Sequence, residues 1–316
     1  MTKVLITGAF GYIGGRVSRY LAEQDHELVL GSHGVAAPAP DWLSKGRVVP
    51  CDLFDDAQLQ AACRSVHSIV HLASINENKC AADPALALHV NGLGSLRALL
   101  AAIQAGASRF IYLSTAHVYA APLSGAIDEK TLPRPLHPYA ISHRVAEDFV
   151  MAAHAKGEIE AVVLRLSNGF GAPERADVDR WTLLTNDLCR QAAVTRRMIM
   201  RSSGNDERDF ITLADTARAI DHFLRLERAS LGDGLFNVGS GRSVHVIEVV
   251  ELIAQRCEAI LGFRPEIVRP AAQTAVTRLD YRIDKLLSTG FSPVAEMQFE
   301  IDATLRLCRD AFADKT

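Results

Sequence analysis

Three side chains near the middle of the chain can exchange protons or hydrogen bonds with a substrate. Tyr139 and His143 are four residues apart in a helical pattern that starts at Pro138, and Thr115 ends the apolar run 110–115. A spacing of four places the phenol and the imidazole on one face of a helix. Such groups act as general acids and bases or stabilise charge that develops on an oxygen. Two half-buried polar residues of an amphipathic helix would look the same, so other parts of the chain have to decide.

A glycine-rich turn near the N-terminus indicates what these groups work beside. The apolar run 4–6 is followed by Gly8, Gly11 and Gly14, and then by a helical pattern from Arg16. Residues without a Cβ let backbone N–H groups approach a pyrophosphate, and the helix start adds partial positive charge. The spacing Gly-x-x-Gly-x-x-Gly also suits a simple β–α turn. Its position directly after an N-terminal strand favours a dinucleotide site.

Alternating strand and helix patterns must position both features. Apolar runs typical of buried strands lie at 4–6, 27–30, 48–52, 67–74, 110–115 and 161–166. Helical patterns separate them, including one at 84–105 and the one from Pro138. This alternation predicts an α/β fold with a doubly wound parallel sheet, the Rossmann architecture.

The composition becomes less regular after Gly171. We therefore predict a dinucleotide-binding domain at 1–167 and a smaller, mixed C-terminal substrate-binding domain at 168–316, with part of 208–240 packing back onto the first. In the second domain we expect helices at 181–193 and 211–226. Between them, the residues at 204–210 are expected to form a polar turn.

Charge and composition argue against several function classes. The 316 residues are 48% apolar and 22% charged, with a net charge of −3, so no basic field favours nucleic acid. No apolar run has the length of a membrane span. The six cysteines form no Cys-x-x-Cys pair and the eleven histidines lack zinc-ligand spacing. We therefore expect reduced thiols, no metal site and a cytoplasmic location.

The ends of the predicted strands supply further cofactor candidates. The second strand runs into Ser32 and His33 without the carboxylate that usually binds the adenosine ribose of NAD. This leans the expectation toward NADP rather than NAD, although an ordinary polar loop has the same composition. Asp52 ends the third strand and could touch adenine or cap a helix. The small residues Ala73 and Ser74 would let a cofactor lie against the backbone.

Together these features resemble the extended short-chain dehydrogenase/reductase family, in the branch of nucleotide-sugar epimerases, dehydratases and reductases. The resemblance covers nearly the whole chain, and its specificity comes from the order and spacing of several modest matches. The matching segments are Thr7-Gly8-x-x-Gly11-x-x-Gly14, Asp52-Leu53, His71-Leu72-Ala73, Asn91, Leu113-Ser114-Thr115, Val118-Tyr119, Tyr139, Arg165-x-x-Asn168, Arg208-Asp209-Phe210 and Asn237-Val-Gly239-Ser-Gly241.

The resemblance, with the strand-end argument, implies a role for each site residue. The expected catalytic residues are Thr115, Tyr139 and His143. The expected cofactor contacts are Gly8, Phe10, Gly11, Tyr12, Ile13, Gly14, Ser32, His33, Asp52, Leu53, Leu72, Ala73, Ser74, Asn91, Tyr139 and His143. The expected substrate contacts are Thr115, Tyr139, Asn168, Arg208 and Arg278. The amide could instead cap a turn, and either arginine could be a solvated surface residue. The resemblance also implies a homodimer formed by the helices around 91–105 and 139–155.

Two departures from the family pattern bear on the reaction. The fifth position of the Tyr-x-x-x-Lys motif is His143, and Ala116-His117 stands where the dehydratases carry Asp-Glu. Without those two acids, elimination of water lacks its proton carriers, so dehydratase activity is disfavoured. The family's lysine is implied to bind the nicotinamide ribose and to stabilise the tyrosinate. An imidazole with a pKa of about 6.5 is mostly neutral at pH 7 and gives less electrostatic help.

The replacement of the lysine by His143 affects the two directions of hydride transfer differently. Oxidation of a sugar alcohol needs Tyr139 as a base, whereas reduction of a ketone needs it protonated. The sequence therefore favours hydride transfer at a sugar carbon of a nucleotide sugar, by either a 4-epimerase or a 4-ketoreductase. Two alternatives remain open: a non-catalytic NAD(P)-binding protein and a reductase of a non-sugar ketone. Arg208 argues against the second, because an apolar substrate has no use for a buried cation.

Overall fold

The computed structural model describes residues 2–33, 38–271, 276–294 and 296–313. Within them, seven strands form one parallel sheet in the order β11-β7-β5-β4-β1-β2-β3. The strands are β1 (Lys3–Thr7), β2 (Glu27–Ser32), β3 (Gly46–Pro50), β4 (Ser68–His71), β5 (Arg109–Thr115), β7 (Glu160–Leu166) and β11 (Leu235–Val238). The chain runs outward from β1 to β3 and then returns to β4 on the other side of β1. This reversal creates a crevice at the carboxyl ends of the strands, as a doubly wound fold requires. The expected Rossmann architecture is confirmed.

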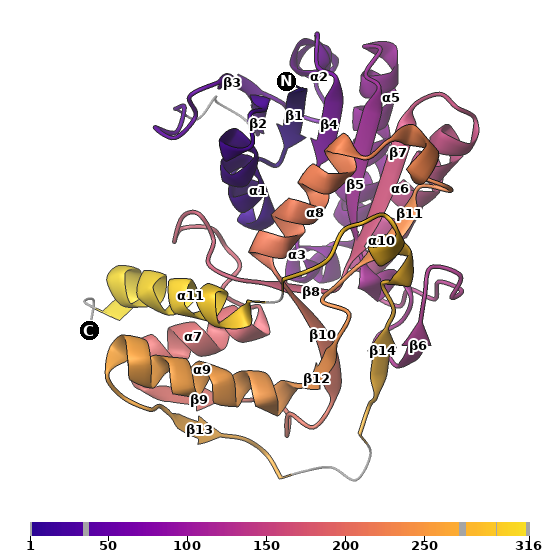
Figure 1. Ribbon diagram of the computed structural model, residues 1–316. Coiled ribbons are helices and arrows are strands. Elements are labelled where there is room, and N and C mark those ends of the chain that lie inside the picture. The colour runs from indigo at the N-terminus through magenta and orange to yellow at the C-terminus, as the bar shows by residue number, and fades with distance from the viewer. Residues whose placement is uncertain (1, 34–37, 272–275, 295, 314–316) are drawn as a thin grey trace.

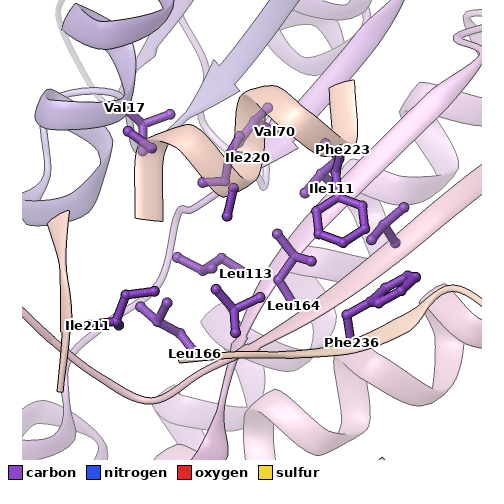
Figure 2. Packing of buried hydrophobic residues seen from close by; sticks show 14 of the residues in the cluster. Val17, Val70, Ile111, Leu113, Leu164, Leu166, Ile211, Ile220, Phe223 and Phe236 are labelled. Atoms are coloured by element: carbon purple, nitrogen blue, oxygen red, sulfur yellow. The ribbon is translucent and has the colours of Figure 1, made fainter. Parts of the chain in front are cut away.

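Helices cover both faces of this sheet. Helices α1 (Tyr12–Glu23) and α8 (Leu213–Arg225) pack on one face, in front of the sheet in Figure 1. Figure 2 shows the core beneath them, where Ile220 and Phe223 of α8 lie over Ile111, Leu164 and other strand residues. Helices α2 (Asp56–Cys63), α5 (Ser95–Gln104) and α6 (Pro138–Ala155) bury a separate apolar cluster on the opposite face. The strands are therefore buried on both faces, which explains their continuous apolar runs.

The helix expected at 84–105 is present, but it is not uniform. It consists of α4 (Pro84–Ala87), a π-helical stretch at Leu88–Gly94 and then α5. By length and composition alone, Pro84–Gln104 could cross a membrane, and 50% of its most apolar window is buried in the fold. A core helix of a globular protein has the same properties.

The second half of the chain builds a smaller layer with its own core. Helices α7 (Leu184–Thr195), α9 (Val246–Leu261) and α11 (Met297–Phe312) pack on one another, at the lower left of Figure 1. A small sheet of β8 (Asn168–Phe170), β10 (Glu207–Thr212) and β12 (Ser243–His245) connects this layer to the large sheet. The remaining elements are α3 (Glu77–Ala82), β6 (Gly125–Ile127), β9 (Arg197–Ile199), β13 (Glu266–Val268), β14 (Leu279–Tyr281), α10 (Asp284–Ser288) and two 3₁₀ turns at Ala116–Val118 and Arg228–Ser230.

Two expectations for this half need correction. The polar turn expected at 204–210 is wrong in its second part, because Glu207–Thr212 forms β10 between β8 and β12. That pairing is non-local and leaves no periodic signal in the sequence. The helix expected at 181–193 begins later, at Leu184, and continues to Thr195. Strand β11 pairs with β7, so residues from the second half complete the edge of the large sheet. The division at residues 167 and 168 stays an interpretation.

Several contacts fasten the first helix to the second half of the chain. Arg16 of α1 forms hydrogen bonds of 2.7 and 3.0 Å with both carboxylate oxygens of Glu300 on α11. It also donates to the carbonyl of Ala172 at 2.9 Å. The phenol of Tyr12 donates to the carbonyl of Gly171 at 3.0 Å. The start of α1 therefore has a fixed position relative to the segment that follows β8.

Candidate functional site

A cleft of about 1220 Å³ opens at the carboxyl ends of the large sheet. Its walls come from the turn after β1, the ends of β2, β4 and β5, the start of α6, and residues 166–185 of the second half. This is the crevice at which parallel α/β sheets bind ligands. The cleft is large enough for a dinucleotide and a second ligand together.

The glycine turn lines the cleft, and at Gly8 and Gly14 its backbone leaves no room for a side chain. Gly8 has a φ of +66°, and a Cβ there would lie 2.9 Å from the backbone of Ala73. A Cβ on Gly14 would lie 2.0 Å from the carbonyl oxygen of Gly8. Helix α1 starts beside this turn without an acidic residue in its first turn. The cradle therefore fits a pyrophosphate, as expected for NAD or NADP.

Most of the expected cofactor residues line this cleft. They are Gly8, Gly11, Tyr12, Ile13, Gly14, His33, Asp52, Leu53, Leu72, Ala73, Ser74, Tyr139 and His143. One oxygen of Asp52 accepts a hydrogen bond of 2.9 Å from the backbone of Phe54, so this carboxylate also stabilises its own turn. The glycine turn and the residues expected beside the nicotinamide therefore line the same cleft.

Three expected cofactor contacts do not line the cleft. Phe10 packs against the apolar cluster beneath α1 and α8, and Ser32 is buried at the end of β2. Asn91 is fully buried, and its amide accepts from the backbone of Ile75 at 2.8 Å and donates to Ser142 at 3.2 Å. It therefore links the loop after β4 to α6 and supports the wall of the cleft from behind.

The three expected catalytic residues belong to the same cleft. Thr115, Tyr139 and His143 all line it, and the rings of Tyr139 and His143 contact edge to face at 4.4 Å. Desolvation raises the pKa of Tyr139 well above its usual value of about 10, and the Glu77 carboxylate adds to this shift. Burial lowers the pKa of His143 to about 4. At neutral pH the phenol is therefore protonated and the imidazole is uncharged.

The two ring nitrogens of His143 have different surroundings. The phenol of Tyr112 on β5 lies 2.6 Å from Nδ1 of His143. Among the described residues, Nε2 of the same ring has no hydrogen-bond partner, although it is buried. The hydroxyl of Ser114, which lines the cleft, is likewise buried without a partner. Unsatisfied buried polar atoms beside a cleft are the groups that a bound ligand would satisfy.

The expected substrate contacts separate into two groups. Asn168 and Arg208 line the cleft, whereas Arg278 is exposed and does not. The amide of Asn168 donates to the backbone carbonyl of Asp209 at 2.8 Å, so it also holds β8 against β10. Arg208 is exposed at the cleft, so the expectation of a buried cation, used above against an apolar substrate, is wrong; it forms no ion pair with any described residue. Its guanidinium is therefore available to an anionic ligand.

Comparison with known proteins identifies the family. A family model described as the NAD dependent epimerase/dehydratase family matches residues 4–239. The chain belongs to this family. A UDP-glucose 4-epimerase of Azospirillum brasilense is 31% identical over 272 residues, which is 80% of this chain and 77% of the relative.

Two solved structures of similar fold carry nicotinamide cofactors. The structure of MoeE5 in complex with UDP-glucuronic acid and NAD is 25% identical, with a TM-score of 0.77 and coverage of 98% of this chain and 99% of that chain. RMD from Pseudomonas aeruginosa complexed with NADPH is 23% identical, with a TM-score of 0.76 and the same coverage. The resemblance inferred from the sequence is confirmed at the level of family and fold.

One feature of this family member escaped the sequence analysis. Glu77 of α3 and Arg180 both line the cleft and form an ion pair of 2.6 Å. Burial would raise the pKa of Glu77, but its bonds to Arg180 hold it below its usual value. Both charges act on Tyr139 in opposite directions: Glu77 raises its pKa and Arg180 lowers it. The pair is separated by 103 residues, so no local motif could have indicated it.

His117 completes this part of the cleft. It occupies the position of the second dehydratase acid and lines the cleft. The charges of Glu77 and Arg208 are close enough to influence its pKa. Burial lowers its pKa, so it is a neutral side chain at pH 7. The part of the cleft next to Thr115 and Tyr139 is therefore polar and carries both signs of charge.

Proposed function

We propose that this protein is an NAD(P)-dependent 4-epimerase of a nucleotide sugar. The observation that carries the proposal is the shared cleft: the glycine cradle, Thr115 with Tyr139, and the unpaired Arg208 line one continuous cavity. The glycine cradle suits a dinucleotide, Thr115 and Tyr139 suit a sugar hydroxyl, and Arg208 suits a diphosphate. A nicotinamide bound there supplies the site that accepts hydride from a sugar carbon and returns it.

The protein's own groups handle the proton and the charge. Beside a positively charged nicotinamide Tyr139 would act as the phenolate, which would take the proton of the sugar hydroxyl as hydride leaves and give it back when hydride returns. Thr115 hydrogen-bonds to the same oxygen and stabilises its charge. His143 binds a hydroxyl of the nicotinamide ribose as a neutral group. Arg208 holds the diphosphate, while the sugar turns to present its other face.

Incubation with UDP-glucose and either NAD or NADP tests this proposal. Formation of UDP-galactose, measured by nuclear magnetic resonance, is the expected result, and Tyr139→Phe should lose it. If the protein binds the cofactor tightly but converts no UDP-hexose, the result would instead favour a non-catalytic NAD(P)-binding protein.

A second candidate is a 4-ketoreductase, and the state of Tyr139 favours it. Its raised pKa and the uncharged His143 leave the phenol protonated, as ketone reduction requires. Consumption of NADPH with a nucleoside-diphosphate 4-keto sugar, without epimerisation of UDP-glucose, would identify this activity. Dehydratase activity is not proposed, because Ala116 and His117 replace both proton carriers.

We further propose that NADP is slightly preferred over NAD. Among the described residues at the end of β2, His33 lines the cleft where NAD enzymes place a carboxylate, so this strand end offers no carboxylate that would repel a 2′-phosphate. Dissociation constants for NADH and NADPH, measured by protein-to-nicotinamide energy transfer, test the preference. Equal or stronger binding of NADH would contradict it.

We also propose a homodimer and a cytoplasmic location. Leucines on the segment Pro84–Gln104 and two residues of α6 are 40–54% exposed, namely Leu86, Leu88, Leu93, Leu100, Ile141 and Phe149. These apolar side chains on two neighbouring helices would be covered by the same helices of a second copy. Phe149→Glu should convert a dimer to a monomer in light scattering. The cysteines are free and buried, which suits a reducing compartment.

A further inference from the structure

We propose that Tyr112 is a positioning residue, which sets the orientation and tautomer of His143 for the cofactor. The inference rests on the proposed function and adds a residue that belongs to none of the motifs above. Its basis is the 2.6 Å contact between the Tyr112 phenol and Nδ1, combined with the unpartnered Nε2 on the other side of the ring.

The contact makes one direction of donation favourable. A phenol is a stronger acid than the N–H of a neutral imidazole, and an imidazole nitrogen is a better acceptor than a phenol oxygen. The phenol of Tyr112 therefore donates to Nδ1, and the ring hydrogen is left on Nε2. His143, which lines the cleft, then carries an N–H donor at Nε2 in place of the ammonium of the family's lysine, but without its charge.

Packing holds both partners in place. Tyr112 is 2% exposed on β5, and its ring stacks on His143 at 5.8 Å and on His71 at 5.9 Å. His143 is 2% exposed and contacts Tyr139 on another side. A ring clamped in this way keeps Nδ1 toward Tyr112, so Nε2 is the nitrogen left for a ligand. An unsatisfied N–H in a buried position is costly, and a ribose hydroxyl would satisfy it.

Removal of the phenol oxygen should free the ring. In Tyr112→Phe the aromatic packing remains, but both tautomers of His143 become accessible and the ring can rotate. Because one oriented hydrogen bond to the cofactor would be lost, NAD(P)H should bind about fivefold more weakly. Tyr119→Phe is the matched control: it removes a buried phenol whose 2.7 Å bond goes to Asn237, and Tyr119 does not line the cleft.

The test combines nitrogen magnetic resonance with a double-mutant cycle. In the wild-type protein without ligand, ¹⁵N shifts of His143 should show the Nε2–H tautomer. In Tyr112→Phe they should show a mixture, and Tyr119→Phe should leave them unchanged. Tyr112→Phe should weaken NADPH binding in the wild-type background and have no further effect in His143→Ala.

Two results would overturn the proposal. One is an Nδ1–H tautomer in the wild-type protein, and the other is an equal loss of affinity from Tyr112→Phe with and without His143. A wild-type protein that binds no nicotinamide cofactor would instead refute the proposed function. The tautomer would then decide alone whether Tyr112 orients His143.

Discussion

The two ends of the cleft are built in different ways. The cofactor end is made largely of backbone, with Gly8 and Gly14 leaving space that a single methyl group would fill. The sugar end is made of side chains, with Glu77 and Arg180 paired across 103 residues beside Tyr139. The first end tolerates almost no substitution but has little chemistry of its own. The second can change its chemistry by single substitutions without altering the fold, which is how one fold supports many substrates.

Gly14→Ala should have the largest effect. The new Cβ would meet the Gly8 carbonyl oxygen at 2.0 Å, so the turn would have to shift and cofactor binding should fall more than about 100-fold. Gly11→Ala is the graded control, because its Cβ would lie 3.2 Å from the same oxygen. Calorimetric titration with NADPH measures both. Similar affinities for the two variants would show that the cradle is not where the pyrophosphate binds.

Tyr139→Phe should have the second largest effect. It should reduce turnover, which depends on the sugar end of the cleft, but not cofactor affinity, which depends on the cofactor end. Loss of the phenol removes the proton carrier, so turnover should fall by about 10²- to 10⁴-fold. Cofactor affinity should stay within a factor of about two, because the ring still packs on His143. A turnover close to wild type would remove Tyr139 from the reaction, whichever direction it runs.

Glu77→Gln should show whether the charged side chains at the sugar end of the cleft set the pKa of Tyr139. It removes the carboxylate that raises the pKa of Tyr139 and leaves Arg180, which lowers it. The ascending limb of the pH–rate profile for sugar oxidation, where Tyr139 loses its proton, should move to lower pH, with a few-fold faster rate at pH 7. Arg180→Gln should shift the limb in the opposite direction. An unchanged limb in both variants would mean that this pair does not act on Tyr139.

The pH dependence of stability should show an effect that is small at pH 7 and grows only toward acid pH. Burial lowers the pKa of His143 to about 4 and that of His71 to about 3, whereas the unfolded chain titrates near pH 6.5. The unfolded state therefore binds protons first as the pH falls, so the free energy of unfolding decreases from pH 6.5 down through pH 4.

His143→Gln should flatten this dependence. The variant lacks one titrating ring, which accounts for at most about 3 kcal/mol at the acid end. Melting temperatures between pH 7 and pH 4 provide the measurement. A wild-type curve that runs parallel to that of the variant would contradict the buried, neutral state of His143.

Much of this architecture could be predicted from the sequence, because its signals are local. A strand, a glycine turn and a helix follow one another within 23 residues, and Tyr139 and His143 share one helix. Strand β10 could not be predicted, since its pairing with β8 and β12 is formed by distant segments. The same holds for Asn91, whose family motif was visible but whose supporting role depends on Ile75 and Ser142. Tyr112 looked like one more apolar residue of a buried strand until His143 was found beside it.

The ties between α1 and the second half have a mechanical consequence. Arg16 forms two hydrogen bonds with Glu300, and Tyr12 forms one with Gly171. These bonds fix the rim of the cleft at the start of α1, beside the phosphate cradle. Widening the cavity at that rim would break several polar contacts at once, including the two that the buried carboxylate of Glu300 accepts from Arg16. The phosphate cradle should therefore keep its shape, because motions that separate α1 from the second half of the chain are disfavoured.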